Sequence, residues 1–394
     1  MSALSHRLRG TLDELRAAGT YKLLRHLTAP MAPVTQIAEI GEVLVFCSNN
    51  YLGLANHPEV VEAGIAGLKK YGAGTASVRF ICGTFDCHLA LEDRIARFLG
   101  TEAALTYVSC WNANEGLITN LVQEGDAIVS DELNHASIID ATRLARQATR
   151  KVYAHSDLDS MRSVLGEVEQ SPVKIVVTDG VFSMEGDIAK LPELTEVCRE
   201  HGATLVVDDS HGTGVLGQHG RGVHEHFGIT ATGPAGVDVF TGTLGKALGG
   251  AAGGYVAGPR EVIDYLIQRS RPQLFSNALP PTVACSAAKA LEILEREPER
   301  VTRLHQNVAK MRSGLQNLGF EVLESPTAIL PIIVGDTAKA IRLSEELLKK
   351  GVFVIGFGFP VVPEGAARLR IQMSAAHTDE HIERALKAFS ELSS

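Results

Sequence analysis

Short apolar runs rich in β-branched residues recur along the central part of the chain, and stretches of helical periodicity separate them. The runs lie at residues 103–108, 127–129, 174–178, 204–207 and 237–240. Extended apolar runs that alternate with helices are typical of a mostly parallel sheet that is covered by helices. The pattern therefore predicts an α/β fold for this part of the chain.

A polar cluster follows most of these runs. The clusters are Asp131–His135, Asp179–Gly180, Asp208–His211 and Thr241–Thr243. In open α/β sheets, ligands bind at the carboxyl ends of the strands. We therefore expect the four clusters to converge on one crevice.

The periodicity also predicts how the chain divides. The apolar positions at 4–18 have helical spacing and begin an N-terminal arm that covers residues 1–50. Residues 51–285 form the predicted large domain. After about residue 285, helical stretches give way to two further strand-like runs, so that residues 286–394 are predicted to form a smaller α+β domain.

Composition restricts the function classes. The 394 residues carry a formal net charge of -9, which argues against a nucleic-acid partner, because such binding usually needs a basic face. The six cysteines contain no Cys-x2-Cys pair that would indicate a zinc or dithiol site. An export signal and a long apolar segment are both absent from the sequence, so we expect a cytoplasmic protein that does not associate with membranes.

Lys246 is the first candidate for chemistry. It follows the run at 237–240 in the segment Thr-Gly-Thr-Leu-Gly-Lys. A partly desolvated lysine amine can act as a nucleophile or base, and glycines let the backbone approach a flat cofactor. A glycine-flanked lysine is more often part of a surface turn, and the Gly-x4-Gly-Lys spacing of a phosphate loop is absent.

Asp208 and His211 follow another run. A carboxylate at a strand end can pair with a protonated heteroaromatic nitrogen, but it can equally cap the turn that follows. His211 is placed to bond either Asp208 or a cofactor oxygen.

His135 and the segment 109–112 complete the set of candidates. An imidazole can stack on an aromatic ring, although a lone histidine is more often structural. The helix that begins after Ser109 offers backbone amides to a phosphate, and the alternative is a simple helix cap.

The chain resembles the α-oxoamine synthases, which are pyridoxal 5'-phosphate (PLP) enzymes of fold type I. The resemblance extends from about Asn49 to His377. The segments that carry it are Ser48–Leu54, Ala76–Thr84, Leu133–Asp140, Thr178–Met184, Asp208–His211, Gly242–Gly250 and Gln372–Thr378. A fold type I PLP-dependent transferase has a mostly parallel central sheet that is covered by helices, together with a smaller α+β domain.

The resemblance implies a role for each of these candidates. It makes Lys246 the Schiff-base lysine and proton-transfer base, with Asp208 on the pyridine nitrogen, His135 stacked on the ring and His211 near the phenolic oxygen. The residues that would bind PLP are Cys110, Trp111, His135, Ser183, Asp208, His211, Thr243 and Lys246. Ser276 and Asn277 would reach the phosphate in the other subunit, which implies a homodimer.

The implied reaction condenses glycine with an acyl-CoA. Arg370 would bind the amino-acid carboxylate with help from Asn50 and His135, since a guanidinium pairs bidentately with a carboxylate. Lys22 and Arg25 are candidates for the CoA phosphates. Acetyl-CoA is the expected donor, and a longer acyl-CoA, as in 8-amino-7-oxononanoate synthesis, is the alternative. A PLP-binding regulator would need an added DNA-binding segment, and no helix-turn-helix pattern is evident.

Overall fold

The computed structural model describes residues 2–231, 233, 236–359 and 361–392. The chain divides into two compact units, Asn49–Leu304 and a second unit made of Met1–Ser48 with His305–Ser394. The larger unit extends beyond residue 285 because helix α11 (Pro281–Arg296) packs against α2 (Pro58–Tyr71) and α3 (Asp86–Leu99). The boundary between the units lies within α12 (Glu299–Asn317).

In the described part of the larger unit, seven strands form one sheet in the order β3-β9-β8-β7-β6-β4-β5. The strands are β3 (Ala103–Tyr107), β4 (Ala127–Asp131), β5 (Thr149–Tyr153), β6 (Lys174–Asp179), β7 (Thr204–Asp208), β8 (Val239–Thr243) and β9 (Gly254–Gly258). The strands from β5 through β4, β6 and β7 to β8 pair in parallel, and β9 pairs antiparallel with β8 and β3. The predicted mostly parallel α/β sheet is therefore confirmed.

The sequence pattern missed two strands of this sheet. Strand β5 is an edge strand whose first residues are exposed and which carries Arg150 and Lys151, so it lacks an apolar run. Strand β9 is fully buried but begins and ends with glycine, which weakens the strand signal. In contrast, Val129, Val176 and Val207 on the central strands are fully buried and gave a clear signal.

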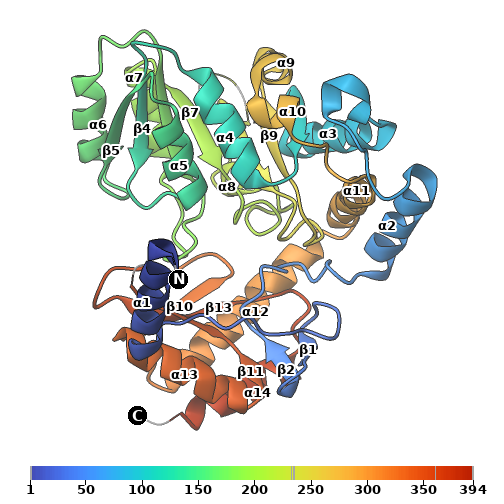
Figure 1. The fold of residues 1–394 in the computed structure, drawn as a ribbon, viewed down its shortest axis with the longest axis vertical. Helices are drawn as coiled ribbons and strands as arrows, with labels where there is room; N and C mark the ends of the chain where they lie inside the picture. Colours follow the sequence, from blue (N-terminus) through green and yellow to red (C-terminus); the bar gives the residue numbers. More distant parts are fainter. Residues whose placement is uncertain (1, 232, 234–235, 360, 393–394) are drawn as a thin grey trace. The chain divides into compact units, whose positions relative to one another are not determined.

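Helices cover this sheet (Figure 1). Helix α4 packs on β8 and β9, α6 on β4 and β5, and α7 on β7, while α4 and α5 lie side by side. Their bounds are α4 (Cys110–Leu121), α5 (Ala136–Leu144), α6 (Leu158–Glu167), α7 (Leu191–Glu200), α8 (Val223–His226), α9 (Arg260–Arg269) and α10 (Arg271–Phe275). A π-helical turn at Arg79–Gly83 precedes α3.

The smaller unit is α+β. Its described part holds the sheets β1-β2-β11 and β10-β13-β12. The strands are β1 (Val34–Ile37), β2 (Gly41–Val45), β10 (Ile329–Gly335), β11 (Val352–Phe353), β12 (Ile355–Phe357) and β13 (Ala367–Gln372), and the helices are α1 (Ala3–Ala17), α13 (Thr337–Lys349) and α14 (Asp379–Ser390). No helix among the residues described here is long and apolar enough to cross a membrane.

Candidate active site

The Lys246 amine lies in the loop that follows β8, at the carboxyl edge of the sheet. Its Nζ is 2.9 Å from Nε2 of His211, and the other ring nitrogen of His211 is 2.8 Å from the Tyr51 hydroxyl. His211 is buried, so that this short chain of polar contacts holds the amine at a defined place. The structure therefore brings Lys246 and His211 together.

Asp208 ends β7 and is buried. One carboxylate oxygen accepts a hydrogen bond from the Ser210 amide at 2.9 Å, and the other accepts from Nδ2 of Asn114 at 2.6 Å. Burial alone would raise the pKa of Asp208, but these hydrogen bonds and the charge of Lys246 outweigh it and hold the pKa below its usual value. Asp208 therefore caps the following turn and also presents a buried negative charge to the site.

His135 is the N-cap residue of α5. Its Nδ1 lies 2.8 Å from the Ser137 hydroxyl, and its ring packs edge-on against Trp111 with the centroids 6.2 Å apart. Part of the side chain is exposed, but the protein around the rest of the ring removes water from it. This desolvation disfavours the charged form and lowers the pKa of His135. A neutral ring can stack on a cationic heteroaromatic group without charge repulsion.

The amino end of α4 reaches the same edge of the sheet. Ser109 caps the helix by accepting a hydrogen bond from the Asn112 amide. Thr243 pairs with Gly254 across β8 and β9. A Cβ at residue 254 would lie only 2.3 Å from the Cys110 nitrogen, so glycine is needed for this close approach. Thr243 and the first amides of α4 are thus neighbours, and a helix amino end is suited to an anion.

Four further predicted residues have the following positions in the structure. Ser183 lies in the loop after β6. Ser276 and Asn277 follow α10 and line a small cavity with Arg79. The Asn50 side chain is buried and its Oδ1 accepts a hydrogen bond from the Ala55 amide.

Arg370 belongs to β13 in the smaller unit. Its guanidinium lies over the Phe357 ring, 4.9 Å from the centroid, and bonds Oε1 of Gln372. Arg25, in the same unit, forms an ion pair with Glu345 at 2.6 Å. The joint action of Arg370 and Asn50 on a carboxylate stays a prediction.

Sequence reasoning missed Asn114 and Tyr51. Asn114 lies four residues after Cys110, which places both side chains on one face of α4, and Asn114 bonds Asp208. The helical spacing was a usable signal, but the contact joins positions 94 residues apart. Tyr51 lies within the segment Ser48–Leu54, and its contact with His211 is visible only in the folded chain.

Asp209 is a second buried carboxyl group that the sequence did not single out. Its Oδ2 accepts hydrogen bonds from the Val223 amide and the Thr213 hydroxyl, both at 3.1 Å, while Oδ1 has no partner in the described part of the chain. Burial, which outweighs these bonds, and the charge of Asp208 raise its pKa to about 8. Asp209 is therefore mostly neutral at pH 7.

We expect Asp209→Asn to alter the pH dependence of stability. The unfolded carboxyl ionises near pH 3.8, whereas the folded one keeps its proton until about pH 8, so the wild type loses stability between these values as pH rises. Relative to the wild type, the variant should gain on the order of 4 kcal/mol in free energy of unfolding from pH 5 to pH 8. Urea unfolding at both pH values measures this, and a difference that stays constant with pH contradicts it.

Together these groups define what the site can do. An amine, a buried ionised carboxylate, an imidazole and a helix amino end fit a flat heteroaromatic cation that carries a phosphate. No cluster of three or more His, Cys, Asp or Glu side chains suited to a metal ion occurs in the described ranges.

A family model of aminotransferases of classes I and II matches residues 41–389, and the chain belongs to this family. Its relatives place it, within the family, among the α-oxoamine synthases. It is 46% identical to the 2-amino-3-ketobutyrate coenzyme A ligase of Salmonella typhimurium over 98% of this chain and 96% of that protein.

Two further comparisons bear on the reaction and the cofactor. The 8-amino-7-oxononanoate synthase of Symbiobacterium thermophilum is also 46% identical, over 99% of this chain and 98% of that protein. A solved structure of SPT (serine palmitoyltransferase) with PLP superposes with a TM-score of 0.92 at 30% identity, covering 99% of this chain and 98% of that one. The structural match confirms the predicted fold type.

Proposed function

We propose that the chain is a PLP-dependent glycine C-acetyltransferase. It condenses glycine with acetyl-CoA and yields 2-amino-3-oxobutyrate and CoA. The observation that carries this proposal is the placement of Lys246 beside His211 and the buried Asp208 at one sheet edge, in a chain 46% identical to a 2-amino-3-ketobutyrate coenzyme A ligase.

The residues present fit PLP. Asp208 would hold the positive charge of the pyridine nitrogen, because its carboxylate is buried, ionised and fixed by two hydrogen bonds. The amides at the start of α4 and the Thr243 hydroxyl would bind the phosphate. His135 would cover the ring, and Ser183 and His211 would bond the phenolic oxygen. When bound, PLP supplies the electron sink that makes loss of the glycine Cα proton possible.

Lys246 moves the proton in this proposal. Its amine takes the Cα proton of glycine, and His211, 2.9 Å away, keeps the amine in position. Arg370 and Asn50 bind the substrate carboxylate. A bond then forms between Cα and the thioester carbonyl carbon, the carbon–sulfur bond breaks, and CoA leaves. The protein therefore contributes by holding glycine and the thioester close together and correctly oriented.

The proposal extends to assembly, location and CoA. The protein is a homodimer in which Ser276 and Asn277 reach the phosphate site of the other subunit, and it acts in the cytoplasm. Lys22 binds a CoA phosphate, and Arg25 joins it once its bond to Glu345 opens. By role, the proposal divides the chain into an arm at 1–50, a PLP-binding domain at 51–285 and a C-terminal domain at 286–394, whereas its compact units are Asn49–Leu304 and Met1–Ser48 with His305–Ser394.

An 8-amino-7-oxononanoate synthase or a broad-specificity synthase is the second candidate, because both types of relative are 46% identical to the chain. We expect acetyl-CoA with glycine to give the highest kcat/KM in a panel of acetyl-, propionyl- and pimeloyl-CoA. One extra methylene in an apolar pocket typically changes discrimination by roughly 10- to 200-fold.

Steady-state CoA release measures the panel, with L-alanine in place of glycine as a control for the amino acid. Preference for the pimeloyl donor with L-alanine would favour the second candidate. An absence of turnover with acetyl-CoA would overturn the proposal.

A further inference from the structure

His155, outside the proposed active site, lies between two carboxylates. Its Nδ1 is 3.0 Å from Oδ1 of Asp131, and its Nε2 is 3.0 Å from Oδ2 of Asp187. The His155 backbone amide also donates to Glu132, and the imidazole packs edge-on against the Phe182 ring at 4.3 Å between centroids. The histidine thus makes specific contacts on both sides of its ring.

These contacts define the charge of His155. An ionised carboxylate only accepts hydrogen bonds, so both ring nitrogens must carry a proton, which makes the ring an imidazolium. Burial disfavours the charge, but the hydrogen bonds to Asp131 and Asp187 outweigh burial and raise the pKa of His155 to about 10. The cluster therefore carries two charge-assisted hydrogen bonds, which are stronger than neutral ones.

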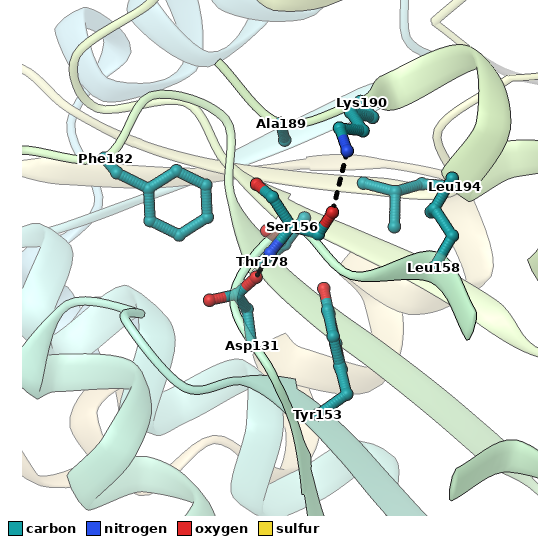
Figure 2. Close-up of a pocket in the computed structure, with 9 residues that line it drawn as sticks. All are labelled: Asp131, Tyr153, Ser156, Leu158, Thr178, Phe182, Ala189, Lys190 and Leu194. Carbon is teal, nitrogen blue, oxygen red and sulfur yellow. Dashed lines mark hydrogen bonds between the residues drawn. The ribbon is translucent and has the colours of Figure 1, made fainter. Parts of the chain in front are cut away.

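The first carboxylate belongs to the end of β4. Besides His155, Asp131 accepts hydrogen bonds from the Leu133 and Ser156 amides, and Figure 2 shows Asp131 facing Ser156 beside Tyr153 and Phe182. The turn that Asp131 holds leads directly to Asn134 and His135.

The same turn is tied to β6. The Asn134 side chain accepts from the Asp179 amide at 2.8 Å, and a carboxyl oxygen of Asp179 accepts from the His135 amide at 2.7 Å. Three adjacent strands, β5, β4 and β6, are therefore linked at their carboxyl ends around the backbone of His135.

The second carboxylate belongs to the loop that carries Ser183. This loop closes on itself through the bridge between Val181 and Ile188 and the bond from the Gly186 amide to Phe182. Asp187 then fixes the closed loop to His155 and so to β4.

We infer that His155 is a positioning residue. As an imidazolium between Asp131 and Asp187, it holds the Ser183 loop in register with the turn that presents His135. This inference rests on the proposed function, because Ser183 and His135 matter as cofactor contacts only in a PLP enzyme. His155 itself contacts neither PLP nor substrate in this assignment.

His155→Gln tests the inference in the holoenzyme, with the visible circular dichroism of PLP and hydrogen exchange of the peptide at 181–188 as readouts. Loss of a charge-assisted hydrogen bond should speed exchange of the Phe182 and Gly186 amides by roughly tenfold and raise the PLP dissociation constant by a similar factor. His201→Gln, which breaks the single pairing with Glu169 at 2.9 Å, is the matched control and should change neither readout.

Asp187→Asn separates positioning from general destabilisation. It should speed exchange in the same peptide, and the double variant should be no worse than His155→Gln alone, because that variant already breaks the contact between His155 and Asp187. Unchanged exchange at 181–188 in His155→Gln, or equal acceleration throughout the sheet, would overturn the inference. Exchange is measured without substrate. Faster exchange in His155→Gln, together with a wild type that does not turn over glycine and acetyl-CoA, would therefore overturn the proposed function and leave the positioning role of His155 intact.

Discussion

Lys246→Ala should lower kcat for the condensation of glycine with acetyl-CoA by at least about 1000-fold while the protein stays folded. A positioned base contributes roughly 100- to 10,000-fold by itself, and Lys246 also carries the proposed attachment to the cofactor. The amine contacts His211 in a half-buried loop rather than filling a core position, so that its removal leaves no large cavity.

Steady-state kinetics and a thermal unfolding scan measure these two expectations. Borohydride reduction of the wild-type holoenzyme should also attach PLP to the peptide that contains Lys246. Lys310→Ala removes a lysine that pairs with the surface carboxylate of Asp379, at 2.5 Å, and it should retain full activity. Lys246→Ala with more than a tenth of the wild-type kcat would refute the assignment.

The sheet could be predicted largely from local pattern. Strands β6 and β7 are buried on both faces, so a continuous apolar run preceded each polar cluster. Strand β5 could not be found in the same way, since an edge strand exposes its side chains and needs no apolar run. Strand β9 depends on Gly254, which allows the close approach to α4, a constraint that comes from packing rather than from periodicity.

The part of the site whose residues directly follow the ends of strands could be predicted from the sequence. Asp208, His211 and Lys246 were placed at one edge by topology alone, and the structure brings them together. The partners of these residues were not predictable from spacing, because Asn114 and Tyr51 reach them from distant segments. The different charge states of Asp208 and Asp209 also needed the fold, because these adjacent aspartates differ in their hydrogen-bond partners and in the charges near them.

Asp208→Asn should reduce kcat/KM by roughly 100- to 1000-fold, the usual loss when one preorganised electrostatic partner is removed. The new side chain keeps one oxygen, which can still accept from the Ser210 amide, whereas its NH2 group would face the donor Nδ2 of Asn114, so one local hydrogen bond is lost together with the negative charge. The lost charge should lower the rate of the chemistry, and PLP should bind more weakly because its ring nitrogen loses its charge partner. The lost bond to Asn114 should add a separate cost of about 1 to 3 kcal/mol in free energy of unfolding.

Asp238→Asn is the matched control for this prediction. Asp238 immediately precedes β8, at the amino edge of the same sheet, where its Oδ2 accepts from the Leu205 amide at 2.7 Å. The same substitution there also removes a carboxylate that bonds a backbone amide, but it leaves the carboxyl edge intact and should keep kcat/KM within about threefold of the wild type. Kinetics and PLP titration of both variants decide the matter. Equal losses in the two would mean that Asp208 supports the sheet, and only a loss confined to Asp208→Asn identifies its charge as the group that works on the cofactor.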